Sequence, residues 1–304
     1  MISIIIVIGI YRHSKKSNDL ILGGNLIKEN MDIDSVTVFT EEISVEKYFR
    51  PSKFSVLNDN REIGKVITDN YKNVIIPNKY ISNPEDTIIN YFSILREAAN
   101  PVKGKFTGCG SIGVGKSPYP IAYNFFDNEY KENISYEKYE DSFKNILHIN
   151  LIKVKKIPEY SDEEMKYFYE IETIQGSETG VGYFAYYYGY ITLIKENDSY
   201  KISCITVTPE EYLCAPYHSW FYSGEYSLEI KYGYWCNLVK KVKGIEVEGY
   251  VKDIIFEGTD GNEYKIEFFT LTNDYDIEIA QFKKNNLNQW ERIYINPEDC
   301  LKNK

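Results

Sequence analysis

The sequence predicts an α+β fold in which three helices pack on a curved antiparallel sheet, flanked by small β-rich N- and C-terminal regions. Apolar residues recur with helical spacing between residues 84 and 147, and with a period of two after residue 148. Short polar turns between the later apolar runs indicate antiparallel pairing. The composition is that of a globular chain, because 43% of its 304 residues are hydrophobic and 26% are charged.

Charge and composition argue against several classes of protein. The 45 acidic residues outnumber the 35 basic ones, and the resulting formal net charge of -10 is unsuited to binding a phosphate backbone. The chain has 3 His and 5 scattered Cys, which disfavours a zinc or iron–sulfur centre. The sequence therefore predicts no nucleic-acid partner, no metal and no cofactor.

Residues 1–34 combine an apolar run with a polar stretch that indicates a tether. Residues 2–11 are apolar except for one serine, but a helix of that length spans only about 15 Å, half of a bilayer core. Arg12 and Lys15 follow the run, whereas an export signal carries its basic residues before it. Three interpretations stay open: a signal segment, the end of an anchor whose true start lies upstream, or a buried strand. The first two predict a location at the cell membrane, on its extracytoplasmic face, and the third a cytoplasmic protein.

The next segments change from strand-like to helical character. Residues 35–82 contain short apolar runs separated by turn residues, and are predicted to form a small β-rich region. A helix is predicted over residues 84–99, because Asn83 can cap it and Pro84 suits its first position. Apolar residues then follow at i, i+3, i+4 and i+7, which gives the helix one apolar face.

Two shorter helices and four long strands complete this part of the chain. The helices are predicted over residues 120–130 and from Ser135 onward, and the strands are HINLIKVKKI, MKYFYEIETIQ, GYFAYYYGYITLIKE and YKISCITVT. We assign these elements to one α+β domain, residues 83–240. A basic break at residues 240–244 separates it from a small all-β domain, residues 245–304.

One motif resembles a nucleotide-binding loop. The residues that match the pattern G-x-x-x-x-G-K-[ST] are Gly110, Gly115, Lys116 and Ser117. A working loop of this kind needs a buried strand before it and an uninterrupted helix after it. The preceding residues are not a buried strand, and Pro118 and Pro120 fall in the first turns of the required helix. We therefore interpret the match as a chance one within a glycine-rich connecting loop, and assign no cofactor to it.

Aromatic residues concentrate in two stretches, 183–190 and 217–235. Alternate side chains of a strand face opposite ways, so both faces of the strand at 183–190 would be aromatic. Two interpretations stay open: packing of the sheet against helix 84–99, or a concave pocket for a small apolar or carbohydrate-like ligand. The predicted ligand-binding residues are Tyr91, Tyr183, Tyr186, Tyr188 and Trp220.

The order of elements over residues 84–208 resembles that of the nuclear transport factor two-like superfamily. The resemblance is carried by helix NPEDTIINYFSILREAA, a short helix, helix SYEKYEDSFKNI and strands that end in LIKENDSYKISCITVTPE. It implies a curved antiparallel sheet wrapped around a long N-terminal helix. The superfamily includes isomerases, dehydratases and cargo-binding proteins, and its membrane-tethered bacterial members usually act as interaction modules.

Two functions follow from these observations. The first is a non-catalytic, membrane-tethered extracytoplasmic binding or scaffold protein with an aromatic-lined cone and a protein or small apolar ligand as its partner. The alternative is a small-molecule enzyme of isomerase or dehydratase type that uses a buried carboxylate in the cone. The prolines that interrupt the helix required after the glycine-rich loop disfavour a nucleotide hydrolase.

Overall fold

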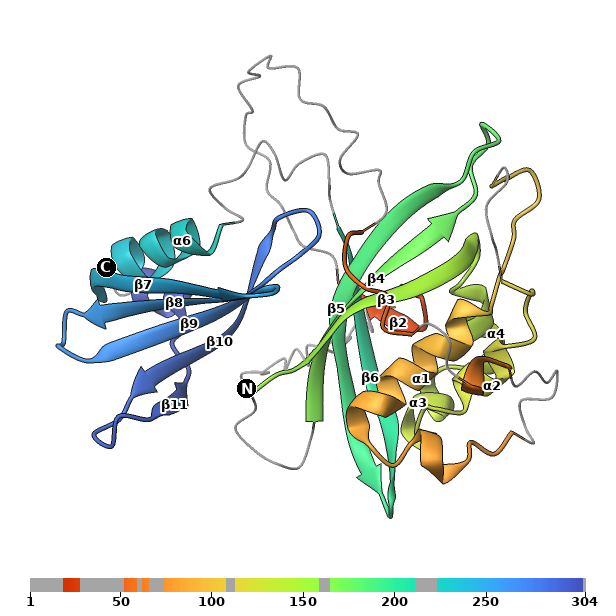
Figure 1. The fold of residues 1–304 in the computed structure, drawn as a ribbon, viewed down its shortest axis with the longest axis horizontal. Coiled ribbons are helices and arrows are strands. Elements are labelled where there is room, and N and C mark those ends of the chain that lie inside the picture. The colour runs from red at the N-terminus through yellow and green to blue at the C-terminus, as the bar shows by residue number, and fades with distance from the viewer. Residues whose placement is uncertain are drawn as a thin grey trace, which may run out of the picture.

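The computed structural model describes residues 19–27, 52–58, 62–65, 74–107, 113–158, 165–210 and 223–302. It is a mixed α+β structure built on two sheets, one of six strands and one of five. Figure 1 shows the sheets side by side, with helix α1 and its neighbours on the face of the larger sheet that is turned away from the smaller one.

The six-stranded sheet is built around four long antiparallel strands. Its order is β1-β2-β6-β5-β4-β3, in which β2 and β6 pair parallel and the other neighbours antiparallel. The hairpin between β5 and β6 turns at Asn197, whose φ of 55° is a conformation that asparagine tolerates. The strands are β1 (Leu20–Ile21), β2 (Gly24–Leu26), β3 (Ile146–Lys156), β4 (Met165–Gln175), β5 (Tyr183–Glu196) and β6 (Ser199–Pro209).

Local capping explains where the helices begin. In α1 (Pro84–Arg96) the side chain of Asn83 accepts a hydrogen bond from the Asp86 amide at 3.0 Å, which confirms the predicted cap. Asp127 and Ser135 cap the helices at Asn128–Asn133 and Tyr136–Asp141 in the same way. The remaining helices of this unit are α2 (Tyr119–Tyr123), α3 (Asn128–Asn133), α4 (Tyr136–Asp141) and the 3-10 turns η2 (Glu62–Lys65) and η4 (Asn78–Tyr80).

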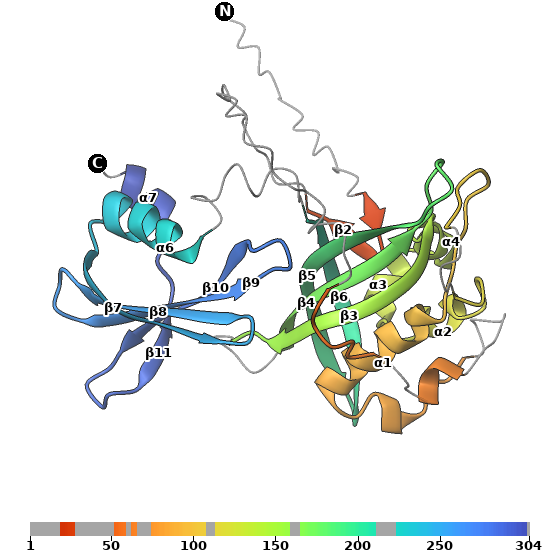
Figure 2. The same ribbon diagram turned by 45° about the horizontal axis from the view of Figure 1, so that its top comes forward.

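The five-stranded sheet is an antiparallel meander with its own core. Its order is β11-β10-β9-β8-β7, and a helical segment packs on one face around Leu228 and Tyr232. In Figure 2 the C-terminal helix α7 lies beside α6 over that face. The elements are α6 (Gly224–Ser227), the π-helix η6 (Leu228–Trp235), β7 (Val239–Glu248), β8 (Val251–Gly258), β9 (Glu263–Thr270), β10 (Asp276–Lys284), β11 (Trp290–Ile293) and α7 (Pro297–Lys302).

The predicted fold, three helices on one curved sheet with small β-rich flanks, is wrong. The C-terminal flank is a second sheet with its own hydrophobic cluster and covering helices, and the described parts of residues 35–82 contain 3-10 turns and no strand. The first unit has four α-helices among its described residues instead of three. Helices of five or six residues show too few turns to give a helical period, so the sequence pattern merged α2 with α3.

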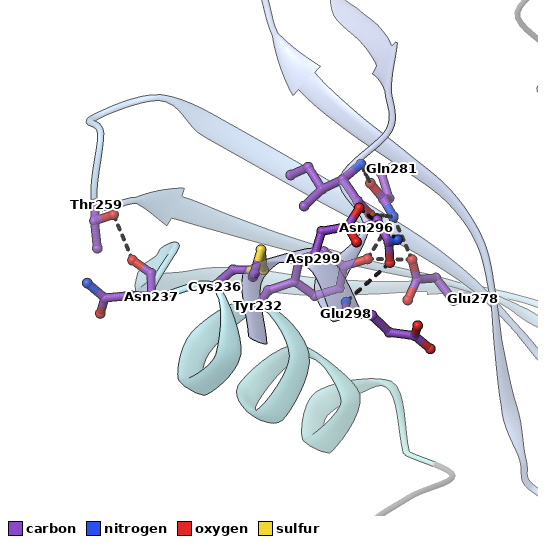
Figure 3. Close-up of a disulfide and its surroundings, with 11 residues drawn as sticks. Tyr232, Cys236, Asn237, Thr259, Glu278, Gln281, Asn296, Glu298 and Asp299 are labelled. Carbon is purple, nitrogen blue, oxygen red and sulfur yellow. Dashed lines mark hydrogen bonds between the residues drawn. A yellow bond between two sulfur atoms is a disulfide. The ribbon is translucent and has the colours of Figure 1, made fainter. Parts of the chain in front are cut away.

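A disulfide fastens the C-terminal helix to the rest of the second unit. Cys236, which follows η6, bonds to Cys300 in α7 (Figure 3). Beside it, Gln281 donates to the Tyr232 hydroxyl at 2.8 Å and to the Ile295 carbonyl at 3.0 Å. The described helices include none that is long and apolar enough to cross a membrane.

Candidate functional site

The predicted ligand-binding residues lie in different environments. Tyr91 is fully buried between α1 and the sheet, where its hydroxyl lies 3.2 Å from that of Tyr139. Tyr183, at the start of β5, is 40% exposed and donates to Gln175 at 2.9 Å. Trp220 lies outside the described residues.

Tyr186 and Tyr188 lie on the face of β5 that is turned away from α1 and its Tyr91. The hydroxyl of Tyr186 donates to Glu172 at 2.8 Å, and burial together with this carboxylate raises the pKa of Tyr186. Tyr188 packs with Phe168 and Phe269, which joins the six-stranded sheet to the five-stranded one. The structure therefore does not bring the described tyrosines of this set to one pocket.

Side chains fill the space between α1 and the sheet. The rings of Tyr91 and Phe126 meet edge to face at 5.5 Å, and Phe92 and Tyr169 lie 5.3 Å apart. These four side chains are at most 2% exposed. The interior of this unit is thus an aromatic core, in agreement with the packing interpretation of the aromatic excess.

The glycine-rich loop serves as a strap between α1 and β3. The Gly113 amide donates to Leu147 at 2.9 Å and the Val114 amide to Glu97 at 2.8 Å. Lys116 pairs with Glu140 at 2.7 Å. Gly110 lies outside the described residues. The amides of residues 113 and 114 therefore both donate to main-chain carbonyls of the protein.

A pocket of about 660 Å³ lies at the junction of the two sheets. Sites for small ligands occupy a similar range, roughly 300–1,000 Å³. Three segments that are far apart in the sequence form its wall: residues 52–54, the turn and strand at 247–252, and the loop at 270–276. The rings of Phe54 and Tyr250 form its aromatic side, with centroids 6.2 Å apart.

The segment that carries Phe54 is fixed on the edge of the six-stranded sheet by a buried asparagine. The Asn58 side chain is 1% exposed, donates to the carbonyls of Phe92 and Ile149 and accepts from the Leu151 amide at 2.9 Å. Farther along, the Ser52 amide donates to Glu172 at 2.6 Å. These bonds hold residues 52–58 against α1 and β3, so Phe54 is placed by the larger unit.

The floor of the pocket is held by a buried ion pair. Lys153 and Glu170 are cross-strand neighbours on β3 and β4, their charged groups are 2.6 Å apart, and both side chains are 0% exposed. Each also bonds the loop between β9 and β10: Lys153 donates to the Thr270 carbonyl at 2.7 Å, and Glu170 accepts from the Thr272 amide at 3.0 Å. Two charged side chains of the six-stranded sheet thus form hydrogen bonds with the main chain of the five-stranded unit.

The same lysine supports the aromatic side of the pocket. The Lys153 ammonium lies 4.4 Å from the centroid of the Phe54 ring and 5.4 Å from that of Tyr250, which are cation–π distances. The Tyr250 hydroxyl donates to the Val154 carbonyl at 2.9 Å, and burial raises the pKa of Tyr250 to about 12. Tyr250 is therefore neutral at pH 7 and bridges the two units.

The polar side of the pocket carries balanced charges. Lys252 lies 2.5 Å from Asp276 and 3.3 Å from Glu225. Burial lowers the pKa of Lys252, but the hydrogen bond and charge of Asp276 outweigh it and leave the pKa above its ordinary value. Asp276 also accepts from Thr270 and from the Gly224 amide. These charged groups compensate one another. They are therefore better suited to forming hydrogen bonds with a ligand than to transferring a proton.

Sequence reasoning missed this pocket. Its residues come from two regions that the sequence assigns separately, 35–82 and 245–304, and Phe54, which is 39% exposed, belongs to no periodic pattern. The described lining contains neither His nor Cys. Within the described ranges, no three His, Cys, Asp or Glu side chains are placed to hold a metal ion.

Comparisons with known proteins add one structural likeness. No family model matches the chain, and no curated protein matches its sequence. A solved Ntf2-like protein involved in plasmid conjugation aligns with 52% of this chain and 88% of its own length, at 8% sequence identity and a TM-score of 0.16. A likeness this loose does not establish a shared fold.

The strap can be tested with Gly113→Ala. A Cβ atom at Gly113 would lie 2.3 Å from the Ala98 carbonyl oxygen, so the strap must shift away from α1. We expect the free energy of unfolding in urea to fall by about 1–3 kcal/mol. Gly233→Ala is the matched control, because a Cβ there makes only ordinary contacts, the nearest at 3.7 Å, and it should leave stability unchanged or slightly higher. Equal effects of both substitutions would contradict the close approach.

The ion pair can be tested with Lys153→Met. This change leaves the Glu170 carboxylate buried without its cation, and we expect a loss of about 3–5 kcal/mol in urea unfolding. The double variant Lys153→Met/Glu170→Leu should recover part of that loss because both charges are removed. Lys144→Met, which breaks the exposed pair with Asp141, is the control and should cost less than about 1 kcal/mol. A loss at Lys153 no larger than at Lys144 would show that the junction does not depend on the pair.

Proposed function

We propose that this protein is a non-catalytic binding or scaffold protein whose ligand site is the pocket between its two sheets. The observation that carries the proposal is the pocket itself, which is large enough for a small ligand and has an aromatic side and a polar side. Such a lining suits a small apolar or carbohydrate-like ligand, because the rings cover an apolar face while threonine and charged groups orient polar atoms.

The arrangement of charges favours binding over catalysis. Lys252 and Asp276 compensate each other, and the Glu170 carboxylate below the floor is compensated by Lys153. The alternative, an isomerase or dehydratase with a carboxylate in an aromatic cone, would need that carboxylate beside α1. Glu170 and Glu172, the buried carboxylates of β4, lie on its other face, since Tyr169 and Ile171, which alternate with them along the strand, pack into the core with α1.

We further propose that the protein acts on the extracytoplasmic face of the membrane. The disulfide between Cys236 and Cys300 supports this location, because such bonds persist in oxidising compartments and are rare in the cytosol. The apolar run at residues 2–11, which lies outside the described residues, is the candidate membrane anchor.

The pocket can be tested with 1-anilinonaphthalene-8-sulfonate, a fluorescent apolar anion, as the probe. Removal of the Phe54 ring in Phe54→Ala should weaken its binding about tenfold, since burial of such a side chain is worth about 1.5–3 kcal/mol. Fluorescence titration measures the effect on protein shown to be folded by its melting temperature. Phe106→Ala, which removes an aromatic ring that is 58% exposed and absent from the lining, should leave binding unchanged. Equal binding by both variants would place the probe elsewhere.

The location can be tested by fractionation of the native host together with thiol alkylation. We expect the full chain in the membrane fraction, with Cys236 and Cys300 unreactive until a reductant is added. Mass spectrometry of alkylated peptides gives the redox state, and Cys204, whose sulfur is in no disulfide, is the internal control. A soluble cytosolic pool with both cysteines alkylated would contradict the proposed compartment.

A further inference from the structure

Strand β7 is a long, open edge of the five-stranded sheet. Among the described strands it pairs only with β8, and eight of its ten residues are exposed. Three of them are apolar: Val242 is 45% exposed, Ile245 47% and Val247 62%. An exposed edge strand offers unpaired main-chain groups to another strand.

A bulge places these three apolar side chains on one face. Val242 lies opposite Phe256, Ile245 opposite Ile254 and Val247 opposite Lys252 on β8, where alternate residues share a face. Lys243 is the extra residue, because the register shifts between Val242 and Gly244. Phe256 and Ile254 belong to the core of this unit, so β7 extends its apolar face to the open edge.

The charges of β7 differ in sign between its two ends. Lys240 and Lys243 are engaged within the chain, with Glu257 and Glu263. In the described part of the chain, Lys241 near the start and Glu246 and Glu248 near the end make no ion pair. Lys241 lies opposite Glu257 on β8 without forming an ion pair with it. A strand with a cation outside any ion pair at one end and such anions at the other is complementary to an antiparallel copy of itself.

We propose that β7 pairs antiparallel with β7 of a second copy of this chain, about a two-fold axis at Ile245. With Lys243 set aside in the bulge, Lys241 then lies opposite Glu248 of the second copy and Val242 opposite its Val247. Ile245 faces its own equivalent. In this register the two side chains of each pair lie on the same face of the sheet. The two five-stranded sheets therefore become one continuous sheet across the axis.

A second copy of this chain is the partner that fits β7, because the strand is complementary to itself. One register pairs Lys241 with Glu248 and the exposed apolar residues with one another, and each contact away from the axis occurs twice because the interface is isologous. The inference shares Val247 with the proposed ligand site, but Phe54→Ala removes an aromatic wall that comes from the larger unit and leaves β7 unchanged. A failure of the pocket and a failure of the dimer are therefore distinguishable.

The test is a charge exchange followed by sedimentation velocity over a concentration series of the full chain. Lys241→Glu places two carboxylates opposite each other twice, and should raise the dimer dissociation constant by at least about tenfold. Adding Glu248→Lys restores opposite charges and should return the constant to about the wild-type value. Lys103→Glu, an exposed change in the other unit, should have no effect. A wild-type monomer at every concentration, or a double variant no better than the single one, would overturn the proposal.

Cysteine cross-linking gives a second readout that does not depend on charge. Side chains directly opposite on antiparallel strands have Cβ atoms about 4.5–5.5 Å apart, which is within reach of a disulfide after small adjustments. Ile245→Cys should therefore form a covalent dimer under mild oxidation, as seen on a non-reducing gel. Val114→Cys, at a residue 61% exposed in the other unit, should give no more dimer than the wild type. Equal cross-linking of both variants would place the contact away from β7.

Discussion

The buried pair of Lys153 and Glu170 fixes how the two sheets meet. Removing two charges from water costs several kilocalories per mole for each, and their attraction compensates only when hydrogen bonds satisfy the remaining polar atoms. Here those bonds come from the other sheet, through the Thr270 carbonyl and the Thr272 amide. The apolar contacts around Phe168 and Phe269 would tolerate small slides of one sheet on the other, whereas the pair is satisfied in one arrangement. The larger unit thus depends on the smaller one to complete its interior.

The pocket is a consequence of that junction. Its floor is the loop that the ion pair holds, and its aromatic side is the Phe54 ring over the same ammonium group. Tyr250 adds a bond from the smaller unit to Val154 in β3. The pocket therefore exists only when both units are folded and docked. A ligand bound there would contact both sheets and stabilise their arrangement, which is the property expected of a binding or scaffold protein.

Local structure could be predicted from the sequence because its causes are local. Asn83 and Pro84 marked the start of α1, and period-two patterns marked the long strands β3 to β6. The cross-strand partner of Lys153 could not be predicted, because it depends on a register with a bulge between Leu151 and Lys153. Strands β1 and β2, of two and three residues, show no period, and the pocket joins residues that sequence patterns treat separately. The chain's aromatic excess left core packing and an aromatic pocket both open, and beside α1 the rings form the core.

The edge strands of the two sheets differ, because another segment covers part of β3 whereas β7 is open. On the larger sheet, β3 is the terminal strand, and residues 57–58 cover part of it through the Leu57 amide and the Asn58 side chain. No described segment does this for β7. The end of β7 nearest the junction carries Val247, which also lines the pocket. A strand paired with β7 would therefore bring its Val242 to the rim of the pocket, so that occupancy of the edge and occupancy of the pocket would be coupled through one side chain.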